Sequence, residues 1–409
     1  MTAPAASARA STPAIILAAT GIVTPPLAVL APLGVAPLLT LVAVALIGAA
    51  PRRLLAAGKP LLPLTTLWAA LAVWAMLSAI WSVLPGHSLF EGGRFLVIGG
   101  EGLIALGAAR SLGARDGWRV GAAAAIGIAL GTALLLFEWA TDAALVHWIH
   151  GWGQAVAVNF SRYDRGATTL VLILWPAVVA LRRWRLLQAA LAALVAVSVY
   201  LMPSAASLMA LVAGVVAFAV ALRFPRLIAA TLAAGVAASA ALLPVVVPSY
   251  ETTVRLQHDA PWIKGSGIHR LLIWRFAAER IADRPLLGWG MDASRDLPGG
   301  RRDFAATLPG IELSPGHDAM PLHPHDALLQ WRVELGIPGT LLGLAIVLWG
   351  LYRVGWRFGP PREAQAAALG WATTVLVIAL LSFGIWQAWW LSDILLTASL
   401  LAASAADAG

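Results

Sequence analysis

The chain has 409 residues, of which 60% are hydrophobic and only 12% charged, and its mean hydropathy is +0.82. A soluble domain cannot bury that much apolar surface, so these values exclude a soluble protein and make the lipid bilayer its solvent. The absence of cysteine excludes disulfides, thiolate catalysis and cysteine-based metal sites, and the net charge of +8 matters through its location along the chain, not as a nucleic-acid signal.

Apolar runs of spanning length predict an all-α, polytopic integral membrane protein with about 12 transmembrane helices. We expect one integrated membrane domain in three stretches: helices one to nine in 1–249, a long, partly helical loop in 250–335, and helices ten to twelve in 336–409. The polar first 12 residues and the many later runs favour a first span over a cleaved signal peptide. The spans are expected near 13–31, 33–50, 64–84, 89–109, 118–138, 167–182, 185–203, 205–222, 227–248, 336–352, 365–385 and 388–406.

Basic residues collect on alternate connections between these spans. One set of tails and loops carries 15 Lys and Arg residues, among them Arg52 and Arg53, whereas the short loops of the other set carry three, including Arg165. The positive-inside rule therefore predicts cytoplasmic termini. All eight histidines and the two longest connections, 139–166 and 250–335, then fall on the outer face. Because loops that long are uncommon unless functional, we expect any chemistry on that face.

Two segments on the predicted outer side carry arginines next to apolar sequence. In "SRYDRGATT" (161–169), Asp164 and Arg165 stand just ahead of the sixth span, and interfacial anchoring is the usual role of such an arginine. The stretch "HRLLIWRFAAERIAD" (269–283) predicts an amphipathic helix that ends before Pro285. Arg270 falls on its apolar face, so it must either snorkel past the helix end or meet an anion.

The stretch "LHPHDALLQWRVELGIPG" (322–339) carries two histidines ahead of an apolar run. Asp326 is expected to be the N-cap of a helix that begins at Ala327 and includes Glu334. A histidine beside a helix N-terminus has a lowered pKa, and neutral imidazole is the form that a general base needs. Two other interpretations stay open: a capped helix with incidental histidines, and a metal site drawn from His317, Asp318, His323, His325 and Asp326.

Three motifs together resemble the O-antigen ligase and polymerase superfamily. "HPHDALLQWRVELGIPG" is similar to the superfamily's His-Pro-His-Asn signature, which is followed by Leu-Gln and Glu-Leu-Gly. "HRLLIWRFAAERIADRPLLGWG" resembles its Arg-x-x-x-Trp helix followed by Pro-Leu-Leu-Gly-x-Gly, and "DRG" at 164–166 resembles Asn-Arg-Gly at the start of a span. Aspartate replaces the usual asparagine at Asp326 and Asp164, and a charge at Asp326 would raise the pKa of His325, against the helix dipole.

The resemblance implies a glycosyltransferase in the bacterial inner membrane with its active site facing the periplasm. Its donor would be an undecaprenyl-diphosphate-linked glycan and its acceptor a sugar hydroxyl of lipid A–core, with membrane lipids as the remaining partners. It implies inverting chemistry without metal or cofactor, with His325 as general base and Arg165 and Arg270 binding the diphosphate. His323, Asp326, Glu334 and Asp164 would take supporting roles.

Other functions remain in consideration. A glycan polymerase or a protein O-oligosaccharyltransferase of the same superfamily shares the donor chemistry and differs in an acceptor that no motif encodes. A polysaccharide or lipid transporter would need functional charges near mid-span, for which Glu101 and Glu138 are the only candidates. A structural scaffold gives no reason for basic residues on both long outer loops.

Overall fold

The computed structural model describes residues 9–51, 59–153, 156–357, 359 and 361–406, so Arg52 and Arg53 lie outside the described residues. The regular elements in these ranges are helices, and one isolated bridge joins Asp303 to Asp318. The long helices are α1 (Thr12–Leu30), α2 (Val35–Ala49), α4 (Leu62–Leu77), α5 (Pro85–Arg110), α6 (Ala114–Ala140), α8 (Asp164–Ala180), α9 (Arg185–Leu201), α10 (Ala205–Ala221), α11 (Pro225–Val246), α13 (Gly265–Asp283), α15 (Ala327–Trp356), α16 (Arg362–Leu381) and α17 (Ala388–Ser404). Shorter pieces are η1 (Pro32–Gly34), η2 (Lys59–Leu61), η3 (Ser78–Ile80), α7 (Ala144–His150), η4 (Phe160–Tyr163), α12 (Tyr250–Asp259), η5 (Ser294–Asp296) and α14 (Phe304–Thr307).

Every predicted span overlaps one of these helices, which confirms an all-α, multi-pass membrane protein. By length and composition, eight helices of the described chain are long and apolar enough to cross a membrane. The helices α9, α10 and α17 are apolar but shorter, and α8 has 17 residues. Twelve crossings therefore remain a prediction, as does the division into 1–249, 250–335 and 336–409.

Prolines interrupt the first helix pair less than their number suggests. Pro25 and Pro26 lie inside α1, which continues to Leu30, and Pro32 starts the short turn η1 that leads into α2. Packing supplies the stability that two missing amide donors remove, since α1 lies along α6 and α8.

The helix α8 is the centre of the bundle. From Gly166 to Ala180 each of its residues is buried, and it packs against α6, α17, α1 and α16. A helix that is apolar all round is expected to be enclosed by others. Its first residues, Asp164 and Arg165, are thereby held at one end of the bundle.

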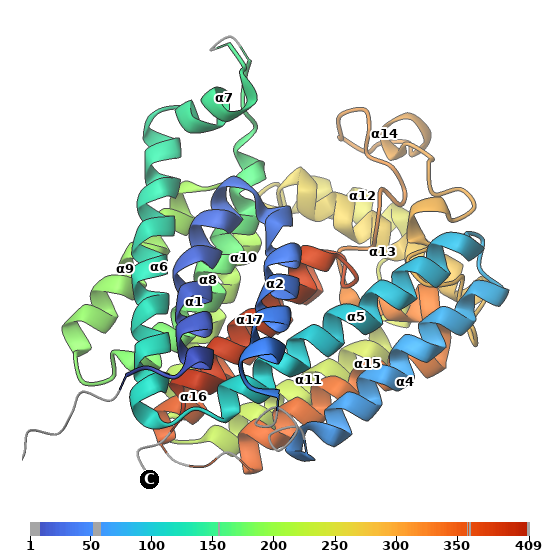
Figure 1. Cartoon of the computed structure of the whole chain (residues 1–409). Helices are drawn as coiled ribbons and strands as arrows, with labels where there is room; N and C mark the ends of the chain where they lie inside the picture. The colour runs from blue at the N-terminus through green and yellow to red at the C-terminus, as the bar shows by residue number, and fades with distance from the viewer. Residues whose placement is uncertain (1–8, 52–58, 154–155, 358, 360, 407–409) are drawn as a thin grey trace, which may run out of the picture.

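The same end carries α12, α13 and α14, and we call it the loop end (Figure 1). A second apolar core there joins Phe276 of α13, Phe304 and Met320 to Leu329 and Val333 of α15. As predicted, α13 buries Ala277 and Ile281 on one face. In Figure 1 the start of α1 and the end of α17 lie at the opposite end of the bundle, in agreement with termini on a shared side.

Candidate active site

The His-Pro-His segment ends in the expected helix cap. Asp326 Oδ1 accepts the amide N–H groups of Leu328 at 2.9 Å and Leu329 at 2.8 Å, and α15 begins at Ala327. His325, just before it, has a φ of +59°, a left-handed conformation that non-glycine residues seldom adopt. The cap and the strained turn together fix where the His325 ring points.

The tautomer of His325 follows from its contact with a backbone carbonyl. Its Nδ1 lies 2.5 Å from the carbonyl oxygen of Ser382, which can only accept. Nδ1 therefore carries the hydrogen, and in the neutral ring Nε2 keeps a free lone pair. Burial lowers the pKa of His325 to about 4, with the Ser382 bond opposing and the Arg270 charge adding to the effect. The direction matches the expectation, but burial, not the helix dipole, is its main cause.

His323 lies against His325, with 4.3 Å between the ring centroids. The amide N–H of His325 lies 3.2 Å from its Nδ1 and that of Gly384 lies 3.2 Å from its Nε2, and the neutral ring accepts at one of these two nitrogens. Burial lowers the pKa of His323 to about 3. The ring is therefore neutral, and it joins the turn before α15 to the connection between α16 and α17.

The charge of Asp164 acts on both predicted arginines, Arg165 and Arg270, although α8 and α13 are far apart in sequence. Arg270 Nη1 donates to the carbonyl of Ser266 at 3.1 Å, whereas its buried Nε has no partner among the described residues. Burial lowers the pKa of Arg270, and Asp164 opposes that shift. Arg165 lies over the ring of Trp389, with its guanidinium carbon 5.5 Å from the ring centroid.

These residues form one neighbourhood with an excess positive charge. Arg270 acts electrostatically on both His325 and His323, which places it near the histidine pair. The charge of Asp164 interacts with those of both Arg165 and Arg270, and one oxygen of Asp164 is buried without a partner in the described chain. Such a site favours a ligand with more than one negative charge.

Glu334 is fully buried and accepts from four other residues. Its oxygens receive the amide N–H of Asp292 at 2.8 Å, the hydroxyl of Ser294 at 2.6 Å and its amide N–H at 3.4 Å. The side chains of Gln330 and Trp386 donate to it at 3.1 and 2.5 Å. With all its acceptor sites used, Glu334 ties α15 to η5 and to the α16–α17 connection.

A break inside α15 explains two of the sequence motifs. Gly336 has a φ of +63°, and the amides of Trp289 and Gly290 donate to the carbonyls of Val333 and Glu334 at 2.9 and 2.8 Å. In return, the amide of Ile337 donates to the carbonyl of Leu286 at 3.0 Å. A Cβ on Gly336 would come within 2.0 Å of that same oxygen, so only glycine fits. The "PLLGWG" and "ELGIPG" motifs thus hold each other, and we call this contact the α15 clasp.

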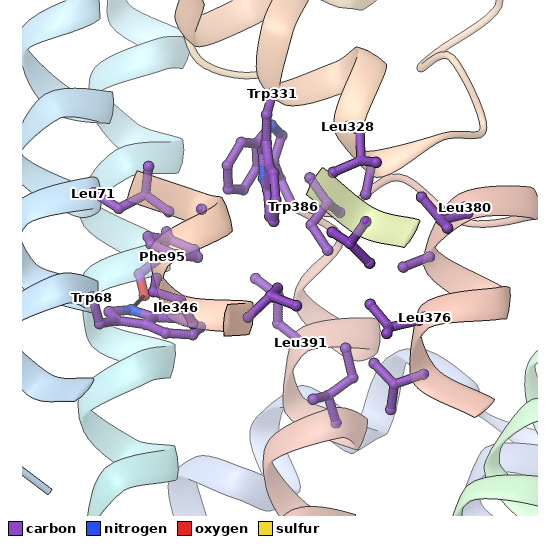
Figure 2. Close-up of a pocket in the computed structure, with 18 of the residues that line it drawn as sticks. Trp68, Leu71, Phe95, Leu328, Trp331, Ile346, Leu376, Leu380, Trp386 and Leu391 are labelled. Atoms are coloured by element: carbon purple, nitrogen blue, oxygen red, sulfur yellow. Dashed lines mark hydrogen bonds between the residues drawn. The ribbon is translucent and has the colours of Figure 1, made fainter. Parts of the chain in front are cut away.

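An apolar cavity of about 150 Å³ lies below this region, between α4, α5, α11, α15, α16 and α17. Figure 2 shows Trp68 and Phe95 from one side and Leu376 and Leu380 from the other pointing into the same space. Trp386, whose indole N–H binds Glu334, lines its upper part. An engineered cavity of similar size in another protein stays dry and binds small apolar ligands.

The group with metal-ligand geometry in the described chain is not the one that the sequence suggested. His87, Glu91 and Asp292 place ligand atoms within 4.8 Å of one another, whereas the predicted candidates were His317, Asp318, His323, His325 and Asp326. Arg94 forms an ion pair with Glu91, and Arg295 pairs with Asp292 at 2.6 Å. Because guanidinium groups already balance both carboxylates, a cation would have to displace them.

Sequence reasoning missed one buried acid. Asp393 on α17 is fully buried, accepts from Thr169 at 2.8 Å and keeps one oxygen unpartnered in the described chain. The statement that Glu101 and Glu138 are the only candidates for buried span charges was therefore wrong. A lone aspartate within "AWWLSDILLTASLL" was a readable signal. Glu138 itself is structural, since it accepts from Tyr163 at 2.6 Å and from two amides of α7.

The family comparison covers most of this site. Residues 189–344 match the O-antigen ligase family model, a stretch that contains His323, His325, Asp326, Glu334 and Arg270. Asp164 and Arg165 lie before it.

Similar proteins are found among rickettsial proteins named "Putative polysaccharide ligase". The one from Rickettsia conorii is 33% identical over 130 residues, which are 31% of this chain and 29% of the relative. The one from Rickettsia prowazekii is 34% identical over 128 residues, or 31% and 29% of the two chains, and the one from Rickettsia felis is 33% identical over 128 residues, or 31% and 30%. The match thus spans less than a third of each relative's length.

Proposed function

Because this chain carries an O-antigen ligase family domain in residues 189–344, we propose that it is a lipid-linked oligosaccharide glycosyltransferase. It transfers a glycan from an undecaprenyl-diphosphate-linked donor to a sugar hydroxyl of lipid A–core. The reaction takes place at the periplasmic face of a bacterial inner membrane and inverts the anomeric configuration without metal or cofactor. The relatives' names support ligase chemistry, and the acceptor and the sidedness are our inference.

The observation that carries the proposal is a neutral His325 with its Nε2 free, beside an arginine pair with excess charge. The diphosphate binds to Arg165 and Arg270, with Asp164 holding the two guanidinium groups apart. The acceptor oxygen attacks the anomeric carbon, the bond from that carbon to the diphosphate oxygen breaks, and the electron pair leaves with the diphosphate. His325 Nε2 takes the hydroxyl proton.

The low pKa of His325 is consistent with this step. The base is unprotonated throughout the neutral range, so none of the protein is lost to the inactive imidazolium form. When the proton arrives, the departing diphosphate supplies a neighbouring anion that stabilises the imidazolium. His323, Asp326 and Glu334 act through position: they hold the turn that presents His325.

The test is transfer in proteoliposomes with purified lipid-linked donor and separate lipid A–core, glycan-repeat and protein acceptors. His325→Ala is expected to lower turnover by about 10²–10⁴-fold with little change in melting temperature, because one proton acceptor is lost. His258→Ala, at an exposed histidine of the same segment, is the matched control and should remain active. Full transfer by His325→Ala would show that His325 is not the general base. Transfer only to repeat units or to protein would show that lipid A–core is not the acceptor.

A further inference from the structure

A second polar pocket lies beside His323 and plays no part in the mechanism above. It has a volume of about 60 Å³, and its walls include Arg94, Arg295, Gln387 and His323. These come from α5, from η5, from the α16–α17 connection and from the turn before α15. We call it the Arg94–Arg295 pocket.

The pocket lies on the His323 side of the histidine pair. His323 is part of its wall, whereas His325 is not among its lining residues. The two histidine rings lie 4.3 Å apart between their centroids, so a molecule in the pocket lies next to the residue that contacts the base.

The polar side chains of the pocket are held in place before any ligand arrives. Arg94 pairs with Glu91 and donates to the carbonyl of Trp386 at 3.3 Å. Gln387 Oε1 accepts the indole N–H of Trp389 at 2.9 Å, and its Nε2 lies 3.3 Å from His323 Nε2. Side chains fixed in this way lose little conformational entropy when they bind a ligand.

The Arg295 side of the pocket is equally fixed. Arg295 Nη2 lies 2.6 Å from Asp292 Oδ2, and His87 Nε2 lies 2.8 Å from the same oxygen. Arg295 itself is exposed, so its remaining N–H donors face the pocket mouth and solvent.

Charge distinguishes the two arginine sites. In the Arg94–Arg295 pocket each guanidinium has its own carboxylate, Glu91 or Asp292, so the two ion pairs are balanced. Among the described residues, Asp164 is the carboxylate whose charge acts on both Arg165 and Arg270. A diphosphate therefore favours the Asp164 site, while the balanced pocket, rich in fixed donors and acceptors, suits an uncharged group with several hydroxyls.

Size points to the same class of ligand. A single water needs about 10–15 Å³ of such space, so 60 Å³ accommodates the equivalent of about four waters. That is enough for the hydroxyl-bearing edge of one sugar ring, and too little for an oligosaccharide.

We propose that the Arg94–Arg295 pocket binds the acceptor sugar through its hydroxyls and presents one of them to His325. This rests on the proposed glycosyl transfer. His323 lines the pocket, and its ring centroid lies 4.3 Å from that of His325, so a sugar whose edge fills the pocket lies beside the histidine pair. Gln387 and Arg295 are positioning residues that set the affinity for the acceptor.

The test measures KM for donor and acceptor separately, in proteoliposomes, with the acceptor on which the wild type is active. Gln387→Ala and Arg295→Gln are each expected to raise the acceptor KM by about 10-fold and to leave the donor KM unchanged, since each removes donors that face the acceptor and none that bind the diphosphate. Leu322→Trp obstructs the pocket from an exposed position without removing a polar group, and it is expected to act likewise. Leu186→Trp, at an exposed leucine of α9, is its matched control.

The outcomes separate this proposal from the proposed function. If the wild type transfers glycan and Leu322→Trp keeps the wild-type acceptor KM, the pocket is not the acceptor site, whatever the polar variants do. An equal rise of donor and acceptor KM in Gln387→Ala would also overturn the assignment. If the wild type forms no glycosidic product with any acceptor, the proposed function fails and this inference fails with it.

Discussion

Glu334 and the pair formed by Arg270 and Asp164 differ in how fully their polar atoms are used. The Glu334 carboxylate receives five hydrogen bonds from four residues and has no acceptor site left. Arg270 and Asp164 each keep a buried polar atom without a partner in the described chain. A saturated group can only support its surroundings, whereas an unsaturated one can gain bonds from a ligand. The two groups should therefore respond differently to mutation.

The largest expected effect is on stability, at Glu334. Glu334→Ala leaves five buried donors unpaired, so we expect a loss of about 3 kcal/mol or more in unfolding free energy. Glu334→Gln, which keeps one oxygen acceptor, should lose less. Thermal unfolding of the purified protein measures both, with the exposed Glu251→Ala as control. If Glu334→Ala unfolds at the wild-type temperature but is inactive, Glu334 has a catalytic role and is not a supporting residue.

Next comes Arg270, where the loss should appear in activity. Arg270→Gln keeps some hydrogen bonding but removes the charge, and we expect kcat/KM for the donor to fall by about 10²-fold with melting almost unchanged. Arg275→Gln is the matched control on the same helix. Arg275 forms an ion pair with Glu279, with 3.1 Å between Nε and Oε1, and is not one of the site residues. If Arg270→Gln lowers the melting temperature as Glu334→Ala does and leaves kcat/KM for the donor unchanged, the two residues do not differ in the proposed way.

The smallest effect concerns Asp326, a support residue with a titrating charge. Burial raises the pKa of Asp326 to about 7 from an ordinary 3.8, so the folded state binds the proton more tightly than the unfolded state. Its contribution to stability therefore falls as pH rises from about 4 to 7. Asp326→Asn retains the cap oxygen without the charge. We expect its free energy of unfolding at pH 8 to exceed that of the wild type by on the order of 1–2 kcal/mol.

The pH dependence is the check on that variant. In thermal unfolding at pH 4 and pH 8, the Asp326→Asn variant should have a higher melting temperature than the wild type only at pH 8. An equal gain at both values would mean that charge burial is not its cause.

The sequence predicted most of what depends on local pattern. Each predicted span overlaps a helix of the described chain, and the amphipathic pattern of 269–283 predicted most of α13 (Gly265–Asp283). Cap chemistry identified Asp326 correctly, since an N-cap depends on only three neighbouring residues. The grouping of Arg165, Arg270 and His325 came from family resemblance and stays a prediction, although the charge of Arg270 does act on His325.

Contacts between distant segments could not be predicted in this way. The proton on His325 Nδ1 is set by the Ser382 carbonyl, 57 positions away, and backbone atoms leave no mark in the sequence. The saturation of Glu334 depends on Trp386, and the Arg94–Arg295 pocket exists only where α5, η5, the turn before α15 and the α16–α17 connection meet. Each arises from tertiary packing that periodicity does not encode.

The position of the α15 clasp along its helix also indicates how deep the neighbouring residues lie in the membrane. Beyond the break at Gly336, residues 337–356 extend for about 30 Å along the helix axis, the thickness of a bilayer's hydrocarbon core. The other segment, 327–335, adds about 13 Å on the loop side. If the longer segment spans the hydrocarbon, Gly336 marks its boundary, Glu334 lies just outside it, and His325 lies farther out, beyond the segment 327–335. One glycine would then set the height of the chemistry above the membrane.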